Sequence, residues 1–86
     1  MLAKQADRFT ETRIDDEIVV MLLDTGDFLS LTGTAVDIWE MIDGSRGRDA
    51  IVAELVAAFD APETAIAADV DGFLARLRET GLLAGE

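Results

Sequence analysis

The chain lacks the side chains on which most enzymes rely for nucleophilic and metal chemistry. Its 86 residues include no histidine and no cysteine. Without imidazole or thiol, neither a Ser–His nor a Cys–His nucleophile can form within this chain, and the commonest metal ligand is missing. Disulfides and thiolate zinc sites are excluded by the same count. Carboxylates are the remaining candidates for chemistry.

Five of the eighteen acidic side chains lie in two segments that have the composition of turns, 15–17 (DDE) and 24–27 (DTGD). Carboxylates in turns are usually solvated, although their number alone would allow a general acid–base pair. The second segment carries only a fragment of a calcium-loop pattern, because the downstream bidentate glutamate is not in place. Residues 44–47 (GSRG) form a weak phosphate candidate. We therefore predict no catalytic site, no metal site and no cofactor.

The charge balance limits the classes of partner. Eighteen acidic residues against seven basic ones give a net charge of −11, which repels nucleic acid and anionic membrane surfaces. The longest strongly apolar run, 18–23, is too short to cross a bilayer, and the first seven residues lack the apolar core of a signal peptide. We expect no nucleic-acid or membrane partner and a cytoplasmic protein. The charge serves solubility alone or steers a basic partner.

The first half of the chain has the composition of β-strands, predicted at about 8–14, 18–23 and 28–31. The first is largely polar, which is typical of an edge strand. The second is continuously apolar, which predicts a central strand covered at least partly on both faces. Gly26 supplies the positive φ that a tight hairpin needs. The pattern predicts a three-stranded antiparallel meander with its third strand at the other edge.

The second half has helical periodicity, predicting helices at about 33–43, 48–59 and 62–80. Thr32 is expected to cap the first helix, and Gly81 to end the third in a Schellman turn that folds Leu82 or Leu83 back on Leu77. The fold class is α+β and winged-helix-like, and residues 1–86 are predicted to form a single domain. The apolar residues expected to face inward are Ala35, Ile38, Trp39 and Ile42 in the first helix, Ile51, Leu55, Ala58 and Phe59 in the second, and Ile66, Val70, Phe73, Leu74 and Leu77 in the third.

Four segments follow one another in a characteristic order: LLDTGDFLSLTGTA (22–35), IWE (38–40), DG (43–44) and DVDGFLARLRETGLL (69–83). Together they resemble the PqqD-like proteins, also called RiPP recognition elements after the ribosomally made, modified peptides that they serve. The resemblance extends from about Arg8 to Leu83. It implies a non-catalytic, winged-helix-like domain that binds the leader part of a precursor peptide.

Two positions depart from the family pattern. Gly47-Arg48 stands where the family often has a threonine cap and an apolar residue, and Ala61-Pro62-Glu63 replaces the more usual Asp-Pro-Glu. We expect a looser start of the second helix and a weaker cap on the third. Both departures lie away from the peptide groove that the resemblance implies.

The resemblance also implies where the leader binds: as an added strand beside the third strand, in a groove shared with the third helix. The residues agree, because the third strand (28–31) has no lysine or proline to blunt an open edge. Alternation turns Leu29 and Leu31 toward the helices. Asp69 and Arg76 flank Phe73 and are candidates for pairing with peptide charges. The predicted peptide-binding residues are Phe28, Leu29, Ser30, Leu31, Asp69, Val70, Phe73, Leu74, Arg76 and Leu77.

Simpler interpretations and other functions remain open. The apolar stripe of the third helix is typical of ordinary core, as is Trp39. A DNA-binding winged helix needs a basic recognition helix, whereas the helices here mix acids with their arginines. An acidic carrier protein needs a serine that opens a helix, and neither Ser30 nor Ser45 does so. A homodimer formed through the third strand would use the same surface as the leader.

The pathway also remains open. The partner peptide is compatible with a lasso-peptide leader and its leader protease, or with a quinone-cofactor precursor and a radical enzyme.

Overall fold

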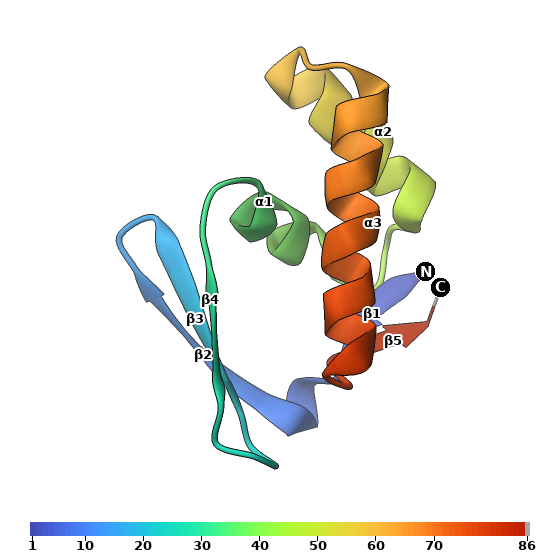
Figure 1. The fold of residues 1–86 in the computed structure, drawn as a ribbon. Helices are drawn as coiled ribbons and strands as arrows, with labels where there is room; N and C mark the ends of the chain where they lie inside the picture. The colour runs from blue at the N-terminus through green and yellow to red at the C-terminus, as the bar shows by residue number, and fades with distance from the viewer. Residues whose placement is uncertain (86) are drawn as a thin grey trace.

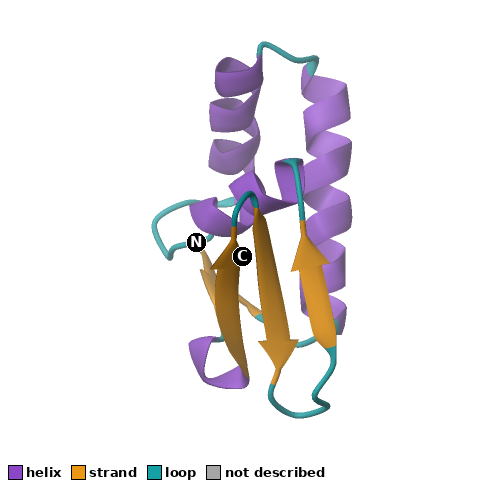
Figure 2. Ribbon diagram, turned by 90° about the vertical axis from the view of Figure 1, so that its left-hand side faces the viewer, coloured by secondary structure: helices purple, strands orange, loops and turns teal. Residues whose placement is uncertain are grey.

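A three-stranded antiparallel sheet lies against three helices in the computed structural model, which describes residues 1–85 (Figures 1 and 2). The strand order is β2-β3-β4, so β3 is central and β2 and β4 are the edges. The predicted meander followed by three helices is therefore confirmed. The elements are β2 (Phe9–Ile14), β3 (Glu17–Leu22), β4 (Phe28–Leu31), α1 (Thr34–Met41), α2 (Arg48–Phe59) and α3 (Glu63–Glu79).

The helices cover only one face of this sheet. Ile18 and Val20 of β3 point toward the helices and are buried, whereas Val19 and Met21 point the other way and are half-exposed. Figure 2 looks directly onto that second face, and no helix stands in front of the three strands. The central strand, predicted to be covered at least partly on both faces, is thus fully covered on one face and only half-buried on the other within residues 1–85. Neighbouring side chains of the sheet give Val19 and Met21 their partial shelter.

The two ends of the described chain form a second sheet that the sequence analysis missed. β1 (Leu2–Lys4) pairs antiparallel with β5 (Leu83–Gly85), with Ala3 opposite Ala84. A 3-10 turn, η1 (Ala6–Arg8), leads from β1 into β2, which therefore begins at Phe9 rather than at residue 8. Leu2 is fully buried and fixes β1 on the core. β1 and β5 lie side by side in Figure 1.

The cap of α1 and the buried face of α2 differ from the predictions. α1 begins after Gly33, which has a φ of +58° and no capping side chain, so the predicted cap at Thr32 is wrong. α2 buries Val52 together with the predicted Ile51 and Leu55. Ala58 and Phe59 are exposed instead, because they lie at the end of α2 where the helix extends beyond the rest of the core.

α3 follows the prediction closely. The five apolar residues of its predicted stripe are all buried. At its end, Gly81 has a φ of +77°. The N–H of Leu82 donates to the carbonyl of Leu77 at 2.9 Å, and the N–H of Gly81 donates to that of Arg78 at 3.1 Å. These are the two hydrogen bonds of a Schellman turn, and fully buried Leu82 completes it.

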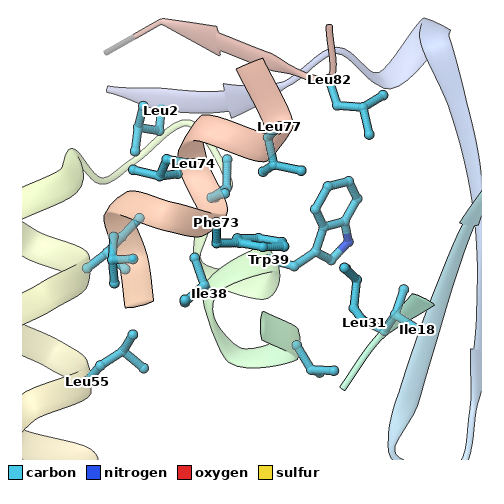
Figure 3. Close-up of a cluster of buried hydrophobic side chains, with 14 of the residues drawn as sticks. Leu2, Ile18, Leu31, Ile38, Trp39, Leu55, Phe73, Leu74, Leu77 and Leu82 are labelled. Atoms are coloured by element: carbon cyan, nitrogen blue, oxygen red, sulfur yellow. The ribbon is translucent and has the colours of Figure 1, made fainter. Parts of the chain in front are cut away.

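Trp39 of α1 links the helices to the sheet (Figure 3). Its indole is almost fully buried and meets Phe9 of β2 edge to face, with ring centroids 5.1 Å apart. Its Nε1–H donates to Glu11 at 3.0 Å, and the Lys4 ammonium lies 4.6 Å from the ring centroid. Burial lowers the pKa of Lys4, against the opposing effect of Glu11 and two further acids. The core role predicted for Trp39 is confirmed.

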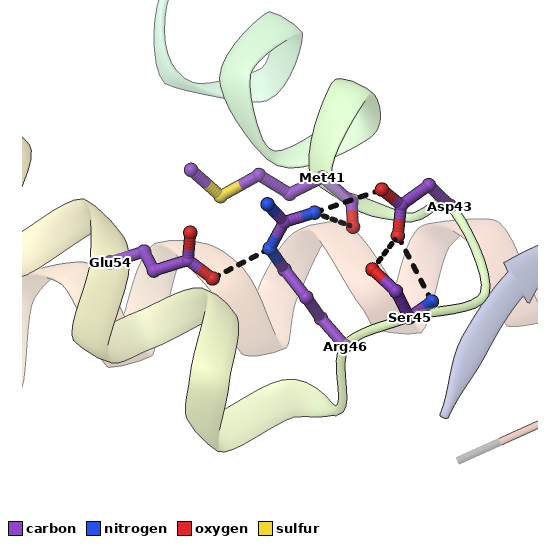
Figure 4. Close-up of polar contacts among 5 residues, drawn as sticks. All are labelled: Met41, Asp43, Ser45, Arg46 and Glu54. Carbon is purple, nitrogen blue, oxygen red and sulfur yellow. Dashed lines mark hydrogen bonds and ion pairs between the residues drawn. The ribbon is translucent and has the colours of Figure 1, made fainter.

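Arginine side chains hold the start of α2, where no side chain caps Gly47. Arg46 donates from Nε to Glu54 at 2.6 Å and from Nη1 to Asp43 at 3.0 Å (Figure 4). Arg48 forms a bidentate ion pair with Asp71 of α3, in which both hydrogen bonds measure 2.9 Å. These bonds raise the pKa of Arg48 and lower that of Asp71. Ion pairs thus fix the position of α2 near its start, where a side-chain cap is missing.

Candidate functional site

The free edge of β4 is the first feature of the candidate site. Within residues 1–85, β4 pairs only with β3. The N–H of Leu22 donates to the carbonyl of Asp27 at 2.8 Å, which sets the phase of the β3–β4 ladder. Because hydrogen-bonded pairs alternate along an antiparallel ladder, the backbone groups of Phe28 and Ser30 point away from β3. These groups are the ones that an added strand would meet.

The side chains of β4 alternate as predicted. Leu31 is fully buried, and Leu29 is partly buried against the same core. Phe28, with 68% of its surface exposed, and Ser30 lie on the opposite face. The edge is therefore anchored by its leucines, and it carries neither lysine nor proline.

The other edge of the sheet has a different character. β2 carries Glu11 and Arg13 at the positions whose backbone groups point outward, a phase fixed by the 3.0 Å hydrogen bond from the N–H of Leu23 to the carbonyl of Arg8. Arg13 also forms an ion pair with Glu40 of α1. Charged side chains are a common protection against strand addition, so β4 is the more accessible edge.

A pocket of about 450 Å³ lies between α3 and α1, at the point where the segment after β4 enters α1. Thr34, Ala35 and Ile38 of α1 line it on one side together with Thr32, which directly follows the last residue of β4. The α3 side is formed by Asp69, Gly72, Phe73 and Arg76 together with Ala68. The pocket therefore begins one residue beyond the end of β4. In Figure 2, α3 rises behind this margin of the sheet.

The structure divides the predicted α3 residues into two groups. Asp69, Phe73 and Arg76 line the pocket, with Phe73 also reaching the core. Val70, Leu74 and Leu77 are buried to 2% exposure or less and lie in the core. Within residues 1–85, neither Asp69 nor Arg76 forms an ion pair with another side chain, so neither charge has a partner from the described chain.

Gly72 is a pocket residue that the sequence analysis missed. A Cβ at this position would meet no atom within 4 Å. Glycine inside a helix is less favourable than alanine by about 1 kcal/mol, so nothing in the packing of α3 explains its presence. Its absent side chain widens the pocket between Asp69 and Phe73. A glycine inside an otherwise helical pattern was the sequence signal.

Other kinds of site receive no support from residues 1–85. No three acidic side chains there converge as a metal site. Every buried side-chain nitrogen or oxygen in this part of the chain has a hydrogen-bond partner. No helix in the described range is long and apolar enough to span a bilayer.

Comparison with known proteins identifies relatives at the level of family and fold. Residues 17–83 match the family model of coenzyme PQQ synthesis protein D (PqqD). A solved structure of "TbiB1 in Complex with the TbiA(beta) Leader Peptide" is 28% identical, with a TM-score of 0.81 and 93% of each chain covered. Another, "Lasso peptide synthetase B1 complexed with the leader peptide", is 15% identical, with a TM-score of 0.83 and 98% of each chain covered. No curated protein sequence matches the chain.

Proposed function

This chain belongs to the PqqD family, and we propose that it binds the leader segment of a ribosomally made precursor peptide. In this role it is not an enzyme: it presents the bound peptide to a separate modifying or leader-cleaving enzyme in the cytoplasm. Support comes from TbiB1, which was solved with a leader peptide and shares 28% of its sequence with this chain.

The open edge of β4 is the observation that carries the proposal. An extended leader placed beside β4 gains main-chain hydrogen bonds to Phe28 and Ser30, which supply affinity for almost any sequence. Selectivity then comes from the pocket, where apolar Phe73 and the charges of Asp69 and Arg76 meet the leader's side chains. The leader is thereby held between β4 and α3.

The enzyme partner is proposed as a class. A leader protease of a lasso-peptide system and a radical enzyme acting on a quinone-cofactor precursor both require their substrate to be held by its leader. A homodimer through β4 is the alternative use of the same edge. It brings together two chains with a net charge of −11 each, and this repulsion favours the leader as the occupant.

The proposal is tested by fluorescence anisotropy with a labelled leader from the precursor encoded beside this chain. We expect the wild type to bind it and a scrambled leader to bind far more weakly. Gly72→Leu should weaken binding by a factor of about ten, equivalent to about 1.4 kcal/mol, because its side chain fills the pocket.

Gly72→Ala is the matched control. It should keep wild-type affinity and raise the free energy of unfolding by about 0.5–1 kcal/mol, since alanine favours a helix. Circular dichroism verifies that both variants fold. A folded Gly72→Leu variant with wild-type affinity would show that the leader does not use this pocket. Sedimentation of the free protein detects the alternative homodimer.

A further inference from the structure

The sheet face turned away from the helices, here called the outer face, carries a continuous apolar stripe. It runs across all three strands from Ile14 through Val19 and Met21 to Phe28. Met21 lies directly opposite Phe28 in the register, and Val19 is diagonal to Ile14. Ile14 is 53% exposed and Phe28 68% exposed. Within residues 1–85, no element covers this stripe (Figure 2).

The composition of the outer face is unusual for this chain. A strand that is solvated on one face normally alternates apolar and polar residues, but β3 places Val19 and Met21 on its open face. The chain has 18 acidic residues. Within β2, β3 and β4, however, Glu17 is the only charged residue whose side chain alternation places on the outer face. An exposed apolar patch with a polar surround is characteristic of a protein interface.

Acidic residues border the stripe at both ends of the strands. Asp15 and Asp16 form the β2–β3 turn, and Asp24 and Asp27 belong to the β3–β4 connection. Two copies stacked face to face with aligned strands would bring acid against acid in either direction. The charges therefore oppose a second copy and favour a partner whose apolar patch is flanked by lysine or arginine.

The outer face is continuous with the proposed leader site. Phe28 and Ser30 direct their backbone groups toward the free edge and their side chains onto the outer face. A leader strand added beside them extends the same sheet, so every second leader side chain projects next to Phe28. Protein and leader then form one surface.

We propose that the outer face docks the enzyme that acts on the precursor, through an apolar patch flanked by basic side chains. This inference rests on the proposed function, because the docked enzyme contacts both the chain and its bound leader. An enzyme seated here contacts the sheet beside the leader strand, close to where the rest of the precursor continues. Recognition of the complex is thereby stronger than recognition of either component.

The test uses Ile14→Lys, which places a cation in the stripe on the strand farthest from the leader. The probe is the purified modifying or leader-cleaving enzyme encoded beside the precursor, titrated by biolayer interferometry onto the chain with its leader bound. We expect about tenfold or greater loss of enzyme affinity, with leader affinity unchanged. Thr12→Lys, exposed on the same face, should act alike. Ala57→Lys, exposed on α2, is the matched charge control.

The outcomes separate the two proposals. A wild-type chain that fails to bind the leader overturns the proposed function. If Ile14→Lys and Thr12→Lys both bind the leader and both bind the enzyme with wild-type affinity, the docking face is overturned but the proposed function is not. The docking face is likewise overturned if the leader-bound wild-type chain binds none of the encoded enzymes. If sedimentation shows that the wild type is a dimer and that Ile14→Lys is a monomer, the outer face binds a second copy of the chain, and the inference is contradicted.

Discussion

Ser30→Pro should lower the affinity for the leader peptide by a factor of about ten or more, because proline has no N–H to donate and its ring occupies the free edge. The fold should survive. The N–H of Ser30 points away from β3, so the β3–β4 ladder loses no hydrogen bond. Proline is tolerated on edge strands for this reason. Anisotropy with the labelled leader measures the effect.

Ser30→Ala is the matched control, since it removes the hydroxyl and keeps the backbone N–H. Its affinity should stay close to that of the wild type. Circular dichroism and thermal unfolding establish that Ser30→Pro is folded. If the folded proline variant binds as tightly as Ser30→Ala, the leader does not pair with β4.

Trp39→Ala should reduce the free energy of unfolding by about 3–5 kcal/mol, the range for truncating a buried aromatic side chain. The change leaves a cavity beside Phe9. It also removes the indole N–H that donates to Glu11 and the aromatic ring that the Lys4 ammonium lies over. Small domains have total stabilities of about 5–15 kcal/mol, so the variant should be close to unfolding. Urea denaturation followed by circular dichroism measures the loss.

Phe28→Ala supplies the comparison for this effect. It also truncates an aromatic residue, but one that is 68% exposed, so its free energy of unfolding should change by about 0.5 kcal/mol or less. Equal urea midpoints for the two variants would contradict the placement of Trp39 at the centre of the core.

Local sequence patterns were sufficient to predict most of the fold. The apolar run of β3 identified the central strand, and Gly26 marked the hairpin turn with its positive φ. The stripe of α3 has one clear period and a glycine stop, so its buried face and its Schellman ending were both predictable. Each of these signals lies within about 20 residues of sequence.

The missed features depend on contacts between distant parts of the chain. β1 and β5 pair across almost the full sequence, and three-residue strands carry no periodicity of their own. α2 has apolar residues around most of its circumference. Its inner face was therefore set by how it packs on α3, which buries Val52, whereas Phe59 is exposed because it lies at the end of the helix beyond the core.

The candidate site was predictable in part for the same reason. Residue types identified the unprotected edge of β4, and spacing placed Asp69 and Arg76 on either side of Phe73. The pocket itself arises where α1 and the residue Thr32 before it meet α3, so Thr32 and Gly72 became pocket residues only through tertiary packing. The direction of the Ser30 N–H depends on the phase of the ladder, which side-chain alternation alone does not reveal.

Amide hydrogen exchange measured by NMR, with and without saturating leader peptide, tests the central claim most directly. The outward N–H groups of Phe28 and Ser30 should exchange much more slowly once the leader is bound. Those of Glu11 and Arg13, in the corresponding phase on the β2 edge, should be unchanged and serve as an internal control. Unchanged exchange at Phe28 and Ser30 in the saturated complex, or new protection at the β2 edge instead, would contradict leader addition to β4.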